Sequence, residues 1–479
     1  MVRNQGNGSW WRAKKRYSLF CGIVLNFLLI AFAPGISRAA TPQISAGFAH
    51  SVELKSDGTV WAWGDNSGYQ LGLGSSFTAT YSSVAEQVTG ISGIIAVAAG
   101  ENHTLALKSD GTVWAWGTND HGQLGNSDLT SSASYSNVPI EVSIPSNETI
   151  KAIAAGTDFS LALDSNGAVW AWGRNDSGQL GSSTLNLNDQ FKPVNISAIT
   201  SVITLPVITQ IAAGQYHALA VDATGLVWAW GGNSNGQLGD GTVNGIPIDS
   251  EDPVKVTGLS GAGNLSGVTK VAAGDLNSFA LMSGGTVTAW GLNATGQLGN
   301  GSKTDANVPV SVSTITGVTA ISAGYSQTIA LKSDGTVWAW GGDVSGELGN
   351  GTTTASTTPQ PNGFTAATSC SAGNFFSLAL KSDGTSWAWG DNSDGQLGNA
   401  AFEPLPSFGT PSSTPTVVIP MGDMNESGTV TAADALLALR VAVGLDSLTA
   451  LDLLVGDMNG DGKITAADAL LILREAVGL

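Results

Sequence analysis

Short apolar segments separated by glycine-rich turns recur seven times in this chain, between residues 44 and 399. Each unit opens with a small-residue step such as Ala-Ala-Gly, passes a turn such as Ser-Asp-Gly, and reaches Trp-Ala-Trp-Gly and Asn-x-x-Gly-Gln-Leu-Gly. The second tryptophan of the units lies at Trp63, Trp116, Trp172, Trp230, Trp290, Trp340 and Trp389. Steps of 49 to 60 residues predict one supersecondary unit repeated with loop insertions.

The pattern inside each unit predicts antiparallel strands. Ser56-Asp57-Gly58 separates two apolar segments, and glycine supplies the positive φ that tight hairpins need. In Trp-Ala-Trp both indoles face one side of the strand, because side chains alternate. Further strands are expected at 138–142, 193–196, 253–256, 308–312 and 415–419. The chain starts at 42–44 without such a strand, so we expect the two ends to pair in one sheet, which closes a ring without exposed edges.

These units predict an all-β seven-bladed β-propeller over residues 41–420. Their motifs resemble the regulator-of-chromosome-condensation repeat family, whose signature matches Gly100 to Leu107 followed by Trp116 to Gly125. The resemblance implies the fold more firmly than a function. The founding eukaryotic members are nucleotide-exchange factors for a nuclear GTPase, whereas a secreted bacterial branch inhibits β-lactamases with one face of the ring.

The first 40 residues carry six basic residues, no acidic residue and an apolar run from Tyr17 to Ala33. This pattern predicts a secretory signal peptide at 1–40, cleaved near Ala39 and Ala40, and a secreted or cell-surface protein with no membrane span in the mature chain. The remaining chain keeps 13 basic against 37 acidic residues, which argues against nucleic acid as a partner. It keeps one cysteine, Cys370, so it has no internal disulfide.

The ring shows no constellation of nucleophile, histidine and acid, and we predict no catalytic residue. His50, His103 and His217 each lie three residues after the repeat glycine, which indicates a structural position. The variable segments are the expected binding surface, because all should leave the ring on one face. They lie at 73–86, 126–137, 182–190, 240–251 and 300–307, with Phe77, Tyr81 and Tyr135 as aromatic anchors. An active site built from such loops remains an alternative.

A second duplication begins at Gly422 and repeats 34 residues later, with 18 of 24 aligned residues identical. Both copies place oxygen-bearing residues at positions 1, 3, 5, 7 and 12 of a calcium loop, with glycine at position 6, and a helix follows. Two Ca²⁺ ions are therefore expected. The predicted ligands are Asp423, Asn425, Ser427, Thr429 (through its carbonyl) and Asp434 in the first loop, and Asp457, Asn459, Asp461, Lys463 (through its carbonyl) and Asp468 in the second. The second loop has three carboxylates against two in the first, which predicts tighter binding there.

Two such loops in residues 421–479, each with aspartate at position 12, resemble a type I dockerin, a small all-α module of paired F-hands. The resemblance implies a cohesin-like partner domain and two related binding poses. Positions 10 and 11, where the family often has Ser or Thr, hold Ala432-Ala433 and Ala466-Ala467, which leaves the cohesin specificity open. The alternative is a calcium-stabilised tail that docks only on its own propeller.

Together these features predict a secreted, non-catalytic binding or scaffold protein. Its propeller face would recognise a protein or a glycan, and the dockerin-like tail would attach it, with calcium, to a cohesin-bearing surface complex. One alternative is a carbohydrate-active enzyme of such a complex, a glycoside hydrolase or polysaccharide lyase, since dockerins are often carried by enzymes of polysaccharide catabolism. The other is an inhibitor of a secreted enzyme.

Overall fold

The structure is a computed structural model. It describes residues 40–126, 129, 134–199, 204–242, 250–400, 411–425, 427–447, 452, 455–458 and 463–477. The predicted signal peptide up to residue 39 and most of the Pro- and Ser-rich stretch before the last strand lie outside these residues. No helix in these ranges is long and apolar enough to cross a membrane.

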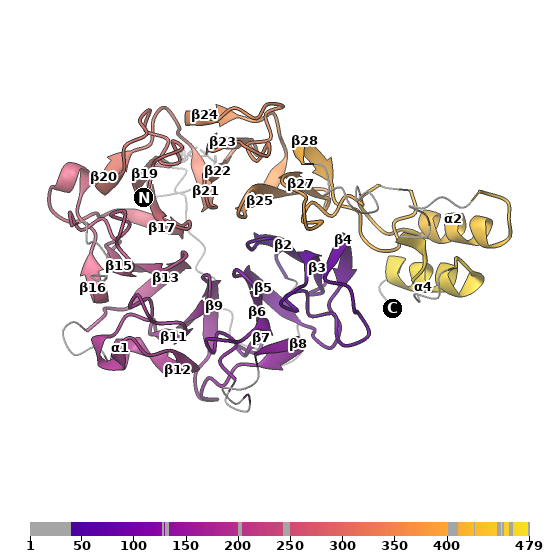
Figure 1. Cartoon of the computed structure of the whole chain (residues 1–479), viewed down its shortest axis with the longest axis horizontal. Coiled ribbons are helices and arrows are strands. Elements are labelled where there is room, and N and C mark those ends of the chain that lie inside the picture. The colour runs from indigo at the N-terminus through magenta and orange to yellow at the C-terminus, as the bar shows by residue number, and fades with distance from the viewer. Residues whose placement is uncertain are drawn as a thin grey trace, which may run out of the picture. The chain divides into compact units, whose positions relative to one another are not determined.

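Seven four-stranded antiparallel sheets form a ring, which confirms the seven-bladed propeller (Figure 1). Each sheet consists of four consecutive strands, and we call the sheets blades 1 to 7 in chain order. Blades 1 to 3 are built from β1 Gln43–Ala46, β2 His50–Leu54, β3 Val60–Asp65, β4 Tyr81–Gln87, β5 Ile94–Ala99, β6 His103–Lys108, β7 Val113–Thr118, β8 Tyr135–Glu141, β9 Ile150–Ala155, β10 Phe159–Asp164, β11 Val169–Gly173 and β12 Gln190–Asn195.

Blades 4 to 7 repeat the same arrangement. Their strands are β13 Ile208–Ala213, β14 His217–Asp222, β15 Val227–Gly231, β16 Ser250–Lys255, β17 Val268–Ala273, β18 Asn277–Met282, β19 Val287–Gly291, β20 Ala306–Ser311, β21 Val318–Ala323, β22 Gln327–Lys332, β23 Val337–Gly341, β24 Ser356–Pro361, β25 Ala367–Ala372, β26 Phe376–Lys381, β27 Ser386–Gly390 and β28 Ser412–Val417. Short helical turns lie at η1 Ser183–Leu185, α1 Ile196–Ile199 and η2 Leu259–Gly261.

The predicted closure through a shared sheet is wrong. Blade 1 has its own fourth strand, β4, and β28 is the fourth strand of blade 7. The segment expected as the variable loop 73–86 therefore ends in a strand from Tyr81 onward. The sequence pattern did not predict β4 because its sequence, Tyr-Ser-Ser-Val-Ala-Glu-Gln, is polar. It also lacks the proline found in the fourth strands of the other blades.

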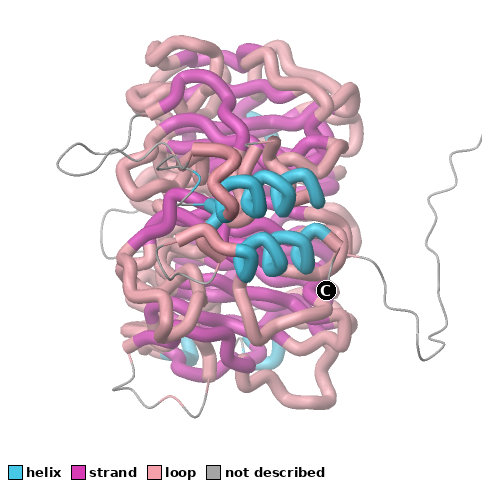
Figure 2. Tube along the Cα trace, turned by 90° about the vertical axis from the view of Figure 1, so that its right-hand side faces the viewer, coloured by secondary structure: helices cyan, strands magenta, loops and turns pink. Residues whose placement is uncertain are grey.

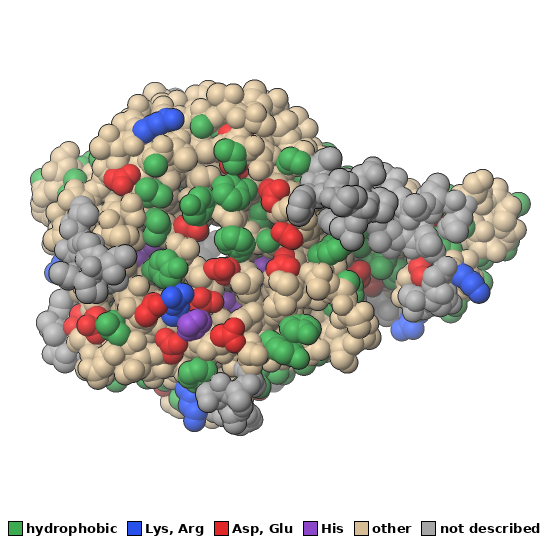
Figure 3. Space-filling model, viewed as in Figure 1, with side chains coloured by type: hydrophobic (Ala, Val, Ile, Leu, Met, Phe, Trp, Pro, Cys, Tyr) green, Lys and Arg blue, Asp and Glu red, His purple; other side chains and the backbone are tan. Residues whose placement is uncertain are grey.

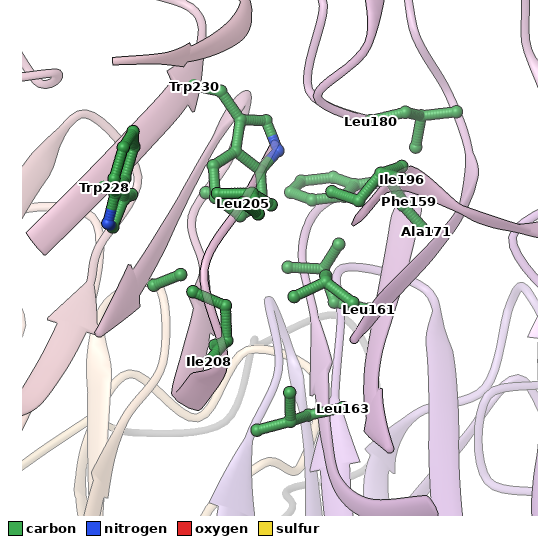
Figure 4. Packing of buried hydrophobic residues seen from close by; sticks show 13 residues of the cluster. Phe159, Leu161, Leu163, Ala171, Leu180, Ile196, Leu205, Ile208, Trp228 and Trp230 are labelled. Atoms are coloured by element: carbon green, nitrogen blue, oxygen red, sulfur yellow. The ribbon is translucent and has the colours of Figure 1, made fainter. Parts of the chain in front are cut away.

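Interlocking side chains between adjacent blades hold the ring together. The second tryptophan of every blade is fully buried, and its indole Nε1 donates to a backbone oxygen of the preceding blade at 2.8–3.0 Å. Figure 4 shows one such junction, where Trp230 of blade 4 packs with Phe159, Leu180 and Ile196 of blade 3. The last junction uses the same bond, from Trp63 to the Gln396 carbonyl at 2.9 Å, so ordinary blade packing closes the ring.

The Gly-Gln-Leu-Gly motif follows from this packing. Gly398 has φ +59°, and a Cβ there would lie 2.7 Å from the Trp63 indole. Only glycine avoids that contact. The equivalent Gly72 has φ +70° and stands in the same relation to Trp116.

The C-terminal region is helical, as expected for a dockerin. Helix α2 spans Ala432–Ala442 and α4 spans Ala466–Ala476, and they pack side by side (Figure 2). Each begins with a capping box, Thr431 with Asp434 and Thr465 with Asp468, in which the side chains and backbone N–H groups satisfy one another. Aspartate at loop position 12 is thus also the third residue of the helix, which completes the capping box.

Candidate functional sites

The first predicted calcium loop gathers its oxygen atoms around Asp423. The Asp423 carboxylate accepts backbone N–H groups of Ser427 at 3.1 Å and Gly428 at 2.6 Å, and Ser427 N–H also donates to the Asn425 side chain at 3.0 Å. Gly428, at loop position 6, has φ +85°, which allows the sharp turn. Asp434 reaches back to accept the Asn425 N–H at 3.0 Å. Positions 1, 3, 5 and 12 therefore belong to one hydrogen-bonded cluster.

The electrostatics of this loop fit a divalent cation. Asp423 and Asp434 are both fully buried carboxylates. Burial raises the pKa of the Asp423 carboxyl, and the neighbouring Asp434 charge raises it further, while backbone N–H groups oppose the shift. Ca²⁺ would offset this repulsion and prefers such hard oxygen ligands. The Asp423, Asn425, Ser427 and Asp434 side chains and the Thr429 carbonyl would hold it.

The second loop is described in part. Asp468 is fully buried and accepts the Thr465 N–H and hydroxyl, each at 2.8 Å, as Asp434 does in the first copy. Asp457 and Lys463, at loop positions 1 and 7, are also described, whereas Asn459 and Asp461 lie outside the described residues. The described part thus repeats the geometry of the first loop at its helix-capping end.

Both C-terminal helices expose apolar side chains at matching positions. Leu436 and Leu439 are exposed on α2, followed by Val443 at its C-cap, and Leu470 and Leu473 are exposed on α4, followed by Val477 at its C-cap. Leu436 is 57% exposed and its counterpart Leu470 is 59% exposed, so the two copies present equivalent rows. Exposed leucines at helical spacing are typical of a protein-docking face. The flanking Ala432-Ala433 and Ala466-Ala467 pairs are also exposed and add no hydroxyl groups.

One face of the ring carries the longer loops. In an antiparallel four-stranded blade the first and third connections lie at the same end, so the turns around the repeat glycines and the variable segments share one face. These segments are shorter than predicted because β8, β12, β16 and β20 begin inside or at the end of the expected ranges. Of the expected anchors, Tyr135 is 47% exposed and stacks on Tyr69, whereas Phe77 packs against the core.

The channel opening on this face contains acidic and aromatic side chains that the repeat pattern did not reveal. A cavity of about 160 Å³ is lined by the Ala-Ala-Gly steps, and Phe48, Glu101 and Asp275 contribute to it. Acidic and hydrophobic side chains surround the central opening in the space-filling view (Figure 3). Tyr325 packs edge-on to Phe375 beside it, at 5.4 Å between ring centroids. All of them except Phe375 directly follow a repeat glycine, and this spacing was the available sequence signal.

Burial raises the pKa values of the acidic side chains at this opening. It raises the pKa of Asp275 to about 7, and the charge of Glu101 adds to the shift. It also raises the pKa of Glu101, with a contribution from Asp158, while Arg174 opposes the change. Arg174 lies 3.4 Å from Asp158 and 2.6 Å from Asp176, so it neutralises part of the acidic surface.

The recurring histidines are structural, as predicted. His103 Nε2 lies 3.0 Å from the Ser160 hydroxyl of the next blade, and that hydroxyl donates to the Gln123 carbonyl. His50 and His217 bond to Thr104 and Ser278 in the same way. His121, outside this set, pairs with Asp189 at 2.8 Å.

Comparisons with known proteins agree with this architecture. The RCC1-like domain family matches residues 30–264 and 93–433, and the dockerin type I family, whose members generally bind calcium and imply a cohesin partner, matches 421–475. Together they fit a non-catalytic binding protein that carries a dockerin. A dockerin also suggests a place in an extracellular, cell-surface complex.

Among curated relatives, the ultraviolet-B receptor UVR8 of Arabidopsis thaliana is 32% identical over 273 residues, which cover 57% of this chain and 58% of UVR8. The probable E3 ubiquitin-protein ligase HERC3 of Homo sapiens is 35% identical over 227 residues, which cover 47% of this chain and 20% of HERC3. The chain thus spans less than two thirds of either relative.

The crystal structure of Prp20p from Saccharomyces cerevisiae, a protein studied for its binding to Gsp1p and histones, aligns with a TM-score of 0.65 at 27% identity. The alignment covers 76% of this chain and 87% of Prp20p. Human WBSCR16, at 24% identity and a TM-score of 0.64, shares the fold over 76% of this chain and 96% of its own. The chain belongs to the RCC1-like domain family, and its C-terminus carries a type I dockerin.

Proposed function

We propose that this is a secreted, non-catalytic binding or scaffold protein, attached through its dockerin to a cohesin-bearing complex and recognising a protein or glycan with the loop-bearing face of its ring. The observation that carries the attachment is the pair of equivalent exposed rows on α2 and α4. Because each row holds the same kind of side chains 34 residues apart, one partner surface fits either copy. Leucine contacts would then replace the hydroxyl contacts that the alanine pairs lack.

Calcium would organise both rows. Two ions are proposed, held by the loop residues predicted from the sequence. In the first copy, the oxygen cluster around Asp423 leads directly into α2 through the Thr431–Asp434 capping box. Ligand binding at position 12 would therefore fix the first turn of the helix that bears Leu436 and Leu439. Metal-dependent folding of this kind suits a module with a small apolar core.

The test uses the full chain and a type I cohesin domain in a binding titration with calcium or with chelator. Leu436→Glu and Leu470→Glu are made singly and together. Either single variant should keep binding within a few-fold, since the other pose remains, whereas the double variant should lose at least about 100-fold. Calcium-independent binding, or unchanged binding by the double variant, would contradict the proposal.

The ring face offers a partner an acidic surface around an apolar centre. Glu101, Asp275 and Phe48 line its cavity, and the Asp158 carboxylate interacts with Glu101 and pairs with Arg174. This chemistry favours a protein segment with basic side chains over an acidic glycan. Replacing Glu101 with Gln should weaken such a partner and make its binding less sensitive to salt.

A carbohydrate-active enzyme is the second candidate, and one observation favours it. Glu101 and Asp275 line the same cavity, and burial raises the pKa of both carboxyl groups, which suits the general acid of such a pair. Turnover of a polysaccharide that Glu101→Gln and Asp275→Asn both abolish would establish the enzyme. Tight stoichiometric binding without turnover would support the binding protein, or an inhibitor if the captured partner is a secreted enzyme.

A further inference from the structure

The fourth strands of the blades share one proline, and blade 1 alone lacks it. In each blade the alanine before the second tryptophan, on the third strand, pairs with one residue of the fourth strand. The proline lies immediately before that paired residue. In blade 1 the equivalent residue is Ala85. The prolines of the other six blades are Pro139, Pro193, Pro253, Pro309, Pro359 and Pro415.

This difference has a direct structural consequence. The fourth strand is the outer edge of each blade, and proline, which has no N–H, prevents a further strand from pairing there. Ala85 instead donates its N–H to the Ile419 carbonyl at 3.0 Å and accepts the Met421 N–H at 2.9 Å. A parallel bridge to Pro420 results. The preceding Val84 is 1% exposed, whereas its blade 2 counterpart Val138 is 44% exposed.

Two more departures from the repeat lie beside this bridge. Glu53 stands on the second strand where the other six blades have a buried alanine, and Ser386 stands on β27 where the others have valine. Glu53 is 5% exposed and Ser386 is 3% exposed. Glu53, Ala85 and Ser386 line one cavity of about 200 Å³, together with Thr429 of the first calcium loop and Glu475 of α4.

The first calcium loop is part of the same contact. Its position-6 residue, Gly428, packs so closely on β28 that a Cβ there would lie 2.6 Å from Val417. The Asp423 N–H donates to the Pro420 carbonyl at 3.0 Å. The chain thus passes from the bridge at Ile419 and Met421 into the first calcium ligand within two residues, and Val84 shares an apolar cluster with α2 and α4.

We propose that the outer edge of blade 1 is a built docking surface for the C-terminal module, and that calcium bound in the first loop stabilises the ring through it. The inference rests on the calcium binding proposed above. A ligand that binds only the ordered loop stabilises every element that orders with it. The bridge at Ala85 connects that loop to the junction between blades 7 and 1, where the ring closes.

The chain provides its own reporter for this coupling. Every tryptophan after residue 40 lies between Trp61 and Trp389, and residues 421–479 contain none, so tryptophan fluorescence follows the ring alone. Thermal unfolding of the full chain is recorded with millimolar CaCl₂ and with EGTA. Calcium should raise the ring's Tm by about 2–5 °C at saturating concentration. Calcium should also slow hydrogen exchange of the Ala85 amide in the unmodified chain.

Ala85→Pro tests the connection, because proline fits this position in six other blades. The variant should still bind calcium by calorimetric titration and should lose the Tm shift. Pro139→Ala, the reverse change in blade 2, should keep it. A shift that persists in Ala85→Pro, or calcium binding without any shift or added protection in the unmodified chain, would overturn the inference and leave the proposed function intact. An absence of calcium binding would overturn both.

Discussion

The buried histidines should make the stability of the ring fall as the solution becomes acidic. The perturbation is replacement of His50, His103 and His217 by glutamine, the residue that blade 6 carries at the same position as Gln327. Each histidine donates through Nε2 to a hydroxyl, and Nδ1 is buried without a partner among the described residues. A second proton would therefore place a charge in a site that excludes water.

The magnitude follows from the shifted pKa values. Burial lowers the pKa of His103 to about 3, with the charge of His50 lowering it further, and burial lowers the pKa of His50 and His217 to about 4. The unfolded chain takes up protons near pH 6.5 and the folded ring does not, so stability is present above pH 6.5 and is lost as pH falls toward 4. Each histidine should cost about 2 kcal/mol between pH 7 and 5, and the three together about 5–6 kcal/mol.

Buried carboxyl groups change the stability of the ring with pH in the opposite direction to the histidines. Burial raises the pKa of Asp275 and Glu86 to about 7, so the folded ring gains protons that the unfolded chain binds only at lower pH. Their contribution is present below the unfolded pKa of a carboxyl group and is lost as pH rises through about 7. Both acids remain in the glutamine variant, so the difference between the two proteins isolates the histidines.

The assay is urea unfolding followed by tryptophan fluorescence at pH 7, 6 and 5. The parent should lose about 5–6 kcal/mol more than the triple variant between pH 7 and pH 5. The single variant His103→Gln should account for about a third of the difference. Equal losses in parent and triple variant would refute the neutral, structural role of these histidines.

Three further predictions concern single side chains. Glu53→Ala, which restores the alanine of the other blades, should raise the unfolding free energy of the ring near pH 7 by about 1–3 kcal/mol, measured in urea. Trp172→Phe removes the 2.8 Å bond to the Gln123 carbonyl and should cost about 2–4 kcal/mol by the same assay. By titration calorimetry, Asp434→Asn should leave the tighter second site and Asp468→Asn only the weaker first site, because the second loop has the additional carboxylate Asp461.

The fold was predictable because the same packing motif recurs in every blade. The second tryptophan and the Leu-Gly step recur in all seven blades and record one packing solution, in which the glycine leaves room for the indole of the next blade. The closure was not predictable, because β4 contains neither the proline nor the apolar alternation of its counterparts. Local pattern cannot reveal a strand whose burial depends on another module.

The acidic site at the channel opening was not predicted from the sequence, for a different reason. Glu101 and Asp275 directly follow repeat glycines, but in the sequence they resemble ordinary loop acids. Their shifted pKa values arise only when the first strands converge around the channel and exclude water. The calcium loops, in contrast, were predictable as candidate sites because all their ligands lie within twelve consecutive residues.

The internal repeat also serves as an alignment of the protein with itself. Several positions hold the same residue in six blades and a different one in the seventh, among them Glu53 for alanine, Ala85 for proline and Ser386 for valine. Other single departures, Thr288, Asp343 and Glu347, lie in blades 5 and 6, whereas Glu53, Ala85 and Ser386 all line one cavity at the junction of blades 7 and 1. Glu53 and Ser386 place buried polar side chains where the other six blades have alanine and valine, and the packing of the ring alone does not need them. Their common location is explained if this junction has adapted to the module that covers it.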